Sequence, residues 1–181
     1  MYFDDEFFLH ENTPITKSEI RAIVYSKLNL NKKDVFWDIG AGSGAVSIEA
    51  SFLCKKVFAV EKKLERVKTI NENIRRAKAK NIDVILGEAP QALEALPSPT
   101  KVFIGGSEDK TFEILTAVER KILNGGIIVA TSITLETLYM IDNFYKEQKK
   151  EIIQVGVTKL SSHKKRMFIA RNPIFIITVW R

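Results

Sequence analysis

The sequence has little cysteine and little histidine. Its 181 residues include one cysteine, Cys54, and two histidines, His10 and His163. A single cysteine forms no internal disulfide and supplies no thiolate cluster, so this composition is typical of a reducing compartment. Two histidines far apart in the sequence argue against a histidine and cysteine zinc site, and we expect no bound metal.

Long apolar runs are absent as well. No stretch approaches the roughly 18–20 apolar residues that cross a bilayer. The chain begins with acidic and aromatic residues rather than with a basic and then apolar signal. We therefore expect a cytoplasmic protein with no membrane segment. At about 100–200 residues per domain the length predicts one domain, 1–181, and a hydrophobic content of 45% is sufficient for a buried core.

The excess of positive charge is moderate. Lys and Arg number 28 against 22 Asp and Glu, which gives a net charge of +6. This balance favours an anionic partner but falls short of a polybasic tail. A nucleic acid and a small molecule with several carboxylates both stay open.

Short apolar runs alternate with segments of helical spacing. The runs predict strands at 35–39, 56–61, 83–86, 102–104 and 127–130. The spacing of apolar residues predicts helices at 16–30, after Gly44, and at 63–80, 111–123 and 135–148. Two further strands, 152–160 and 167–180, predict a terminal hairpin with a basic connection. This order predicts an α/β fold, a Rossmann-like seven-stranded, mostly parallel sheet with a C-terminal antiparallel hairpin and helices on both faces.

A glycine-rich loop, Asp38-Ile39-Gly40-Ala41-Gly42-Ser43-Gly44, follows the first predicted strand. In an open parallel sheet this first turn forms the floor of the ligand site. Glycines at alternate positions let a ligand lie against the backbone and allow positive φ angles. The spacing differs from the G-x-G-x-x-G of dinucleotide loops, and no phosphate-binding Gly-Lys-Ser/Thr is present. An oxidoreductase is therefore the function that the loop favours least.

Two acidic positions follow the loop at strand ends. Glu61 ends the second strand, where a carboxylate accepts hydrogen bonds from ribose hydroxyls. Together with the loop it resembles the S-adenosylmethionine-dependent methyltransferases of the seven-stranded fold. Gly87-Glu88-Ala89 ends the third strand, where that fold contacts the adenine. The alternatives are a loop that serves only as a tight turn and an ordinary strand-to-helix connection.

The loop after the fourth strand points to a bulky acceptor. It reads Ile104-Gly105-Gly106-Ser107-Glu108 instead of the Asp/Asn-Pro-Pro-aromatic motif of base-modifying amino-methyltransferases. Two glycines open space and expose backbone N–H groups. We expect a site for a large ligand with anionic or carbonyl groups.

Several motifs occur in an order that resembles one family. They are Asp4-Asp5-Glu6-Phe7, Pro14-Ile15-Thr16-Lys17, Trp37 to Gly44, Gly87-Glu88-Ala89-Pro90, Phe103-Ile104-Gly105-Gly106-Ser107 and Arg171-Asn172-Pro173. Taken together they are similar to the CbiT family, the decarboxylating cobalt-precorrin methyltransferases of cobalamin biosynthesis that methylate carbon 15.

The resemblance implies a cofactor, a reaction and partners. It implies methyl transfer from S-adenosyl-L-methionine to carbon 15 of a precorrin-6B type tetrapyrrole, with loss of carbon dioxide from the ring C acetate. It also implies a homotetramer and a separate carbon 5 methyltransferase in the same pathway. No catalytic base is assigned. The residues that it implies for cofactor binding are Thr16, Gly40, Ala41, Gly42, Ser43, Gly44, Glu61, Glu88 and Ala89.

A tetrapyrrole of this kind carries many carboxylates. Glycines and cationic side chains near the acceptor are therefore candidate contacts. Arginine is the better bidentate partner for a carboxylate. A solvated basic hairpin tip is the alternative, and His163 is expected at the surface. The candidate substrate residues are Gly105, Gly106, Ser107, Arg166 and Arg171.

Two other functions stay open. An RNA methyltransferase of the same fold suits the net charge of +6 and the basic hairpin. The glycine pair at 105–106 and the lack of a recognisable RNA-binding appendage argue against it, so nucleic acid is not the expected partner. A non-catalytic subunit that binds S-adenosylmethionine is the other alternative.

The N-terminal aromatic residues Phe3, Phe7 and Phe8 allow two interpretations. They form a lid over the pocket, or they fix the N-terminus to the body of the protein. We favour the second, because an N-terminus without such contacts is poorly ordered.

Overall fold

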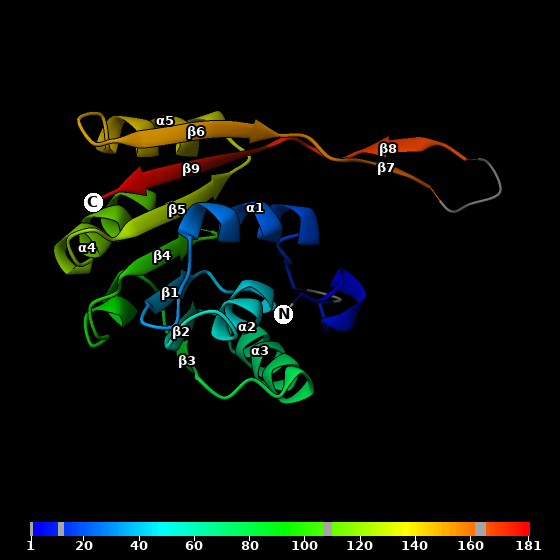
Figure 1. Cartoon of the computed structure of the whole chain (residues 1–181), viewed down its shortest axis with the longest axis horizontal. Helices are drawn as coiled ribbons and strands as arrows, with labels where there is room; N and C mark the ends of the chain where they lie inside the picture. The colour runs from blue at the N-terminus through cyan, green and yellow to red at the C-terminus, as the bar shows by residue number, and fades with distance from the viewer. Residues whose placement is uncertain (1, 11–12, 107–109, 162–165) are drawn as a thin grey trace.

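The computed structural model describes residues 2–10, 13–106, 110–161 and 166–181. Figure 1 shows a twisted sheet with helices on both faces and a thin ribbon that extends from one end. The helices are α1 (Ser18–Leu28), α2 (Ala45–Ser51), α3 (Leu64–Ala77), α4 (Thr111–Lys121) and α5 (Leu135–Phe144), with two short 3₁₀ turns, η1 (Asp5–Phe7) and η2 (Gln91–Leu93). The strands of the main sheet are β1 (Val35–Ile39), β2 (Lys56–Glu61), β3 (Ile82–Leu86), β4 (Lys101–Ile104), β5 (Ile127–Ser132), β6 (Lys150–Val155) and β9 (Ile174–Trp180).

The strand order is β3-β2-β1-β4-β5-β9-β6. The first five strands pair in parallel, and β9 is antiparallel to both β5 and β6. This is the predicted α/β fold, and the expectation is confirmed. The order reverses on either side of β1 and β4, so the loops after these strands diverge and leave room for a ligand at their carboxyl ends.

The C-terminal hairpin differs in detail from the prediction. Strand β9 lies inside the sheet, and β6 forms the edge opposite β3. Each of the two long predicted strands is divided: β7 (Thr158–Leu160) and β8 (Phe168–Ala170) form a separate two-stranded ribbon. The breaks fall at Gly156 and at Arg171-Asn172-Pro173. Glycine favours a bend in a strand, and proline donates no ladder hydrogen bond.

The core divides into two layers because successive strand residues face opposite sides of the sheet. Trp37 and Ile39 of β1 pack in the cluster that includes α4 and α5, whereas Phe36 packs in the cluster that includes α1 and α2. In Figure 1, α1, α2 and α3 lie on the near face of the sheet. Burial on both faces explains why the central strands read as nearly continuous apolar runs.

The N-terminal aromatic residues attach the first segment to the body, as expected. Phe8 is buried, and Phe3 and Phe7 pack against the same cluster, which also contains Ile48 of α2. The rings of Phe3 and Phe7 are stacked with their centroids 4.3 Å apart. The segment therefore covers α2 rather than forming a separate lid.

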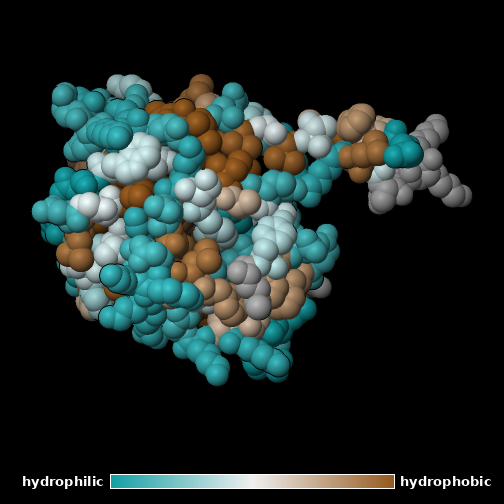
Figure 2. Space-filling view, viewed as in Figure 1, coloured by the Kyte–Doolittle hydropathy of each residue, from teal (hydrophilic) through white to brown (hydrophobic). Residues whose placement is uncertain are grey.

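The ribbon of β7 and β8 extends past the carboxyl end of β5 (Figure 1). Its apolar side chains Met167, Phe168 and Ile169 are exposed, as the brown patch on the arm in Figure 2 shows. In the described part of the chain, none of the helices combines the length and apolar character that a bilayer crossing requires.

Candidate functional site

A cavity of about 650 Å³ lies at the carboxyl ends of β1, β2, β4 and β5. Its volume is within the range of small-molecule sites. The loops after these strands line it, together with the segment before α1 and the segment between the ribbon and β9. The cavity therefore lies where the doubly wound topology predicts a ligand site.

The glycine-rich loop forms one wall of this cavity. Gly40, Gly42 and Gly44 have φ angles of +76°, +56° and +79°, a conformation that favours glycine. A Cβ atom on Gly40 would lie 2.7 Å from the Gly106 carbonyl oxygen, and one on Gly42 would lie 2.7 Å from the Pro14 carbonyl oxygen. Both the dihedral angles and the close backbone contacts exclude side chains at Gly40 and Gly42. The loop thus exposes bare backbone to the cavity.

Glu61 connects this loop to the end of β2. Its side chain is 3% exposed. One carboxylate oxygen accepts a hydrogen bond from the Gly42 N–H at 3.0 Å, and the other accepts one from the Lys63 N–H at 3.0 Å. The Arg66 guanidinium lies 3.7 Å from the second oxygen. A carboxylate has about four acceptor sites, so Glu61 retains acceptor capacity on the side that lines the cavity.

Gly87, Glu88 and Ala89 line the cavity opposite the loop. Ala89 is buried and packs in the core cluster under the cavity. Glu88 is exposed, and its carboxylate oxygens lie 2.6 Å from the Lys110 ammonium and 3.7 Å from that of Lys62. The hydrogen bond from Lys110 lowers the pKa of Glu88 below its ordinary value.

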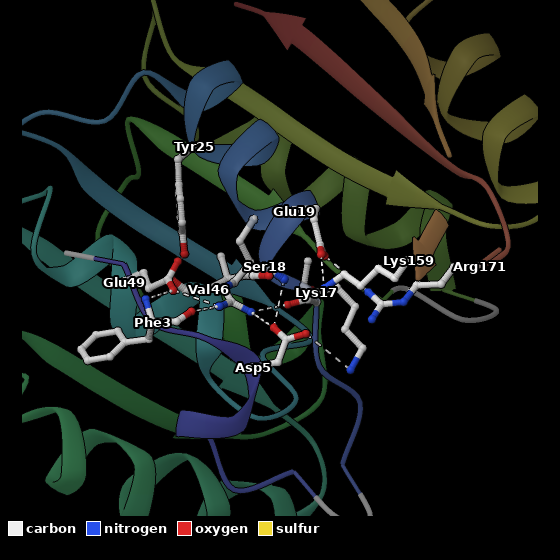
Figure 3. Close-up of polar contacts among 12 residues, drawn as sticks. Phe3, Asp5, Lys17, Ser18, Glu19, Tyr25, Val46, Glu49, Lys159 and Arg171 are labelled. Carbon is white, nitrogen blue, oxygen red and sulfur yellow. Dashed lines mark hydrogen bonds and ion pairs between the residues drawn. The ribbon is translucent and has the colours of Figure 1, made fainter. Parts of the chain in front are cut away.

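Thr16 lines the cavity from the segment before α1. Its carbonyl oxygen accepts a hydrogen bond of 2.7 Å from Arg21, a side chain with no exposed surface. The same guanidinium bonds to the Asp5 carboxylate at 2.8 Å, the Phe3 carbonyl at 2.6 Å and the Glu49 carboxylate at 3.0 Å (Figure 3). Arg21 therefore holds the N-terminal segment, the start of α1 and α2 together.

Sequence reasoning missed Arg21. A signal exists, because Arg21, Val24 and Leu28 have the i, i+3, i+7 spacing of one helix face, and both apolar residues are fully buried. A cation on an apolar face indicates a buried ion pair. Its partners come from distant parts of the chain, and no local pattern identifies them.

Asp38 precedes the glycine loop but is not among the residues that line the cavity. It is buried, and its carboxylate accepts a hydrogen bond of 2.5 Å from the Ser47 hydroxyl of α2. Burial raises the pKa of Asp38 from 3.8 to about 7, and the Ser47 hydrogen bond opposes this rise. Through this hydrogen bond Asp38 links β1 to α2, on either side of the glycine loop.

This shift gives a testable pH dependence. Between pH 4 and 7 the folded protein keeps a proton on Asp38 that the unfolded chain releases, so stability falls as pH rises through this window. A change from 3.8 to about 7 corresponds to roughly 4 kcal/mol. We expect Asp38→Asn, which has no such proton to release, to show a flatter dependence of unfolding free energy on pH. Urea titrations at several pH values measure it, and an unchanged slope would contradict the assignment.

Part of the cavity lining is apolar. Ile20, Ile133, Val155, Val157 and Ile174 form this apolar chamber. Gly105 and Gly106 are exposed at its edge, and a Cβ atom on Gly106 would meet nothing within 4 Å. The glycine pair thus leaves the edge of the chamber next to Gly40 without side chains.

The candidate substrate residues are placed differently from one another. Gly105, Gly106 and Arg171 line the cavity. Arg166 is described on the ribbon, beyond β7, and is not a lining residue. Ser107 and His163 lie outside the described residues. The structure thus brings three of the five candidates to one site.

Several charged side chains line the cavity. Within the described ranges, no group of three or more histidine, cysteine, aspartate or glutamate side chains is arranged to hold a metal ion. The charged lining residues are instead mostly basic: Lys17, Lys62, Arg66, Lys110 and Arg171, against Glu61 and Glu88.

Comparison with known proteins gives the family. The family model of the precorrin methyltransferase domain matches residues 6–181. The chain belongs to the precorrin methyltransferase family. This confirms the resemblance drawn from the ordered motifs.

Full-length relatives of this family carry a more specific name. A protein of Sulfurisphaera tokodaii is 38% identical over 181 residues, which cover 96% of this chain and 94% of the relative. One from Methanocaldococcus jannaschii is 39% identical over 184 residues, with 98% and 97% covered. Both are named probable cobalt-precorrin-6B C(15)-methyltransferase (decarboxylating).

Solved structures agree with this assignment. The precorrin-6y C5,15-methyltransferase structure from Geobacter metallireducens has a TM-score of 0.95 at 39% identity, with 100% of this chain and 97% of that chain covered. The precorrin 8W decarboxylase of Methanobacterium thermoautotrophicum has a TM-score of 0.93 at 27% identity, with 98% of both chains covered. A tRNA (m1A58) methyltransferase from Aquifex aeolicus, at 17% identity and a TM-score of 0.77 over 96% of this chain and 72% of its own, shares the fold alone.

Proposed function

We propose that this precorrin methyltransferase transfers a methyl group from S-adenosyl-L-methionine to carbon 15 of a cobalt-precorrin of the precorrin-6B type. In the same proposal it releases the ring C acetate carboxyl as carbon dioxide, in cobalamin biosynthesis. The observation that carries the proposal is one cavity that a bare glycine loop, a buried carboxylate and an apolar chamber line together. The names of the full-length relatives support the choice of acceptor.

The residues around the glycine loop suit the methyl donor. We infer that the Glu61 carboxylate accepts from the ribose hydroxyls and that residues 40–43, which line the cavity, lie against the donor. The predicted contact at Gly44 does not fit, because Gly44 is not a lining residue and faces Ile70 of α3. Ala89 and Glu88 lie where the adenine would contact the end of β3, and Thr16 closes the opposite side. When bound, the donor supplies a methyl group already activated on a sulfonium.

The chain's main contribution to the reaction is alignment. An activated methyl group needs in-line approach of the nucleophilic ring carbon more than it needs a strong base, and fixed geometry supplies much of such a rate. The chamber walls are apolar, so their side chains offer no nucleophile that would compete with the reacting carbon. The conjugated macrocycle itself accepts the electron pair that loss of carbon dioxide leaves, and a proton then takes the place of the lost carboxyl on the side-chain carbon.

No general base is assigned. Among the lining residues that the structure describes, the carboxylates are Glu61 and Glu88. Glu61 is committed to two backbone N–H groups, and Glu88 is paired with Lys110 and Lys62. Neither is in the apolar chamber, so an aligned acceptor fits the geometry better than proton abstraction.

The test is a coupled assay on the purified protein with precorrin-6B type substrate and donor labelled in the methyl group. We expect label in the tetrapyrrole and carbon dioxide in equal amounts, with no carbon dioxide released when the donor is omitted. Binding of S-adenosylhomocysteine is measured in parallel by calorimetry. Donor binding without transfer to the tetrapyrrole would refute the acceptor, and absence of binding would refute the methyltransferase itself.

The RNA methyltransferase alternative has in its favour the net charge of +6 and the shared fold of the tRNA enzyme. That likeness extends to fold only, and the chamber beside the glycine loop is lined by apolar side chains, with the basic residues on other parts of the cavity. We expect no label in tRNA under the same conditions. A non-catalytic role would instead give donor binding with no product from either acceptor.

We also propose a cytoplasmic homotetramer that acts with a separate carbon 5 methyltransferase. The family resemblance supports the homotetramer and the separate methyltransferase. The exposed apolar side chains of the ribbon support self-association.

A further inference from the structure

A cluster of charged side chains lies at the start of α1, beside β7 and the segment that joins β8 to β9 (Figure 3). Lys17 and Arg171 line the cavity. Glu19, in the first turn of α1, lies 3.4 Å from the Arg171 guanidinium and forms an ion pair with Lys159 of β7. Lys17 lies 3.6 Å from Asp5. One carboxylate, Glu19, thus bridges two cations that come from the two sides of the ribbon base.

Backbone contacts place Arg171 beside the cavity. The Arg171 N–H donates to the Val157 carbonyl at 2.9 Å, and Val157, which lies between β6 and β7, lines the cavity. Lys159 lies two residues further along, in β7, and it reaches the site through its ion pair with Glu19. The backbone position of Arg171 therefore does not depend on its contact with Glu19.

We propose that Arg171 and Lys159, assisted by Lys17, bind a carboxylate of the polycarboxylate acceptor, and that Glu19 holds the place of this carboxylate until the acceptor binds. The inference rests on the proposed function and names a subsite within it. Arginine suits this role because its planar fork matches a carboxylate. Glu19 is 30% exposed and Arg171 36%, so solvent reaches the pair and exchange of one carboxylate for another is inexpensive.

Glu19 remains charged at neutral pH and so competes for the cations. The hydrogen bond from Lys159 lowers its pKa below the ordinary value, and burial opposes this effect. An internal competitor lowers the affinity for any single carboxylate. It thereby favours an acceptor whose ring and other carboxylates add contacts elsewhere in the site.

The experiment uses uroporphyrin, a tetrapyrrole with many carboxylates, as the probe and measures the quenching of its fluorescence on titration with the full chain. We expect Arg171→Ala to weaken binding about tenfold, the effect of one lost charge-assisted contact. We expect Arg171→Lys to weaken binding less than Arg171→Ala does, because the positive charge remains. Some loss is still expected, because lysine lacks the planar fork of arginine. Glu19→Gln is expected to strengthen binding about threefold, since the competitor is removed.

Glu72→Gln is the matched control. Glu72 pairs with Arg75 on the exposed surface of α3, and it is not among the cavity residues. We expect no change from it. Unchanged binding in Arg171→Ala, or unchanged or weaker binding in Glu19→Gln, would overturn the subsite.

A second titration, with S-adenosylhomocysteine, separates this proposal from the function on which it rests. Every variant is expected to bind it as the wild type does, which also shows that each variant is folded. If the wild type binds S-adenosylhomocysteine but the uroporphyrin results fail, the subsite is wrong and the proposed methyl transfer stands. If the wild type does not bind S-adenosylhomocysteine, the proposed function fails first.

Discussion

Replacement of Arg21 by methionine is expected to lower the free energy of unfolding by about 3–5 kcal/mol, the range for breaking a buried ion pair. The guanidinium has no exposed surface, and Glu49, its partner on α2, is 1% exposed. Methionine fills part of the volume but leaves the Glu49 carboxylate buried without its cation. The bonds to Asp5, Phe3 and Thr16 are lost as well. Urea unfolding followed by circular dichroism measures the change.

Arg75→Met is the control for this variant. Arg75 also pairs with a glutamate, Glu72, but its side chain is 75% exposed. Exposed pairs contribute about 0–1 kcal/mol, so we expect little effect. In the double variant Arg21→Met, Glu49→Leu we expect part of the stability to return, because no buried charge remains uncompensated. Equal losses in the two arginine variants would show that burial of Arg21 carries no energetic weight.

Glu61→Ala is expected to weaken S-adenosylhomocysteine binding by about 1.5–3 kcal/mol, which is the range for hydrogen bonds to a charged group. The same change removes the acceptor of the Gly42 and Lys63 N–H groups, so the loop loses its link to β2. Calorimetric titration of both proteins measures the difference. Thermal unfolding, recorded beside it, reports how much of the loss comes from the loop.

Two further variants separate the roles of Glu61. Glu65→Ala removes an exposed carboxylate on the first turn of α3, outside the cavity, and we expect unchanged affinity. Glu61→Gln keeps an acceptor for one backbone N–H but loses the charge, and we expect an intermediate affinity. Wild-type affinity in both Glu61 variants would show that Glu61 does not contribute to cofactor binding.

Much of the fold follows from local patterns in the sequence. The predicted strand 56–61 has the observed bounds, and the predicted helices 63–80 and 111–123 are α3 and α4 with shorter C-terminal ends. At the end of α3, Lys78 takes a left-handed conformation with φ of 55°, which stops the helix. Lysine gives little local signal of this conformation, so a periodicity argument places the end too late.

The candidate site was predictable where backbone geometry dominates. The glycine loop, Glu61 and Ala89 each lie at or just after the end of a strand that a local pattern predicts. The structure brings them to one cavity. The basic connection was less predictable, because its distance from the body depends on the breaks at Gly156 and Pro173. These breaks turn one hairpin into a sheet edge and a projecting ribbon, and they leave Arg171 at the cavity while Arg166 is away from it. Pairing across the sheet decides this, and single-residue preferences do not.

The cavity is closed by opposite ends of the chain. Pro14 to Lys17 form one side, and Arg171 to Ile174 form another, so Glu19 and Arg171 meet across 152 positions of sequence. A nascent chain that extends only through β5 therefore contains the glycine loop but lacks residues 171–174, so its cavity is incomplete. Contacts of such long range carry a loop-closure cost, so we expect the cavity to be complete only once residues 171–174 have packed beside the segment before α1.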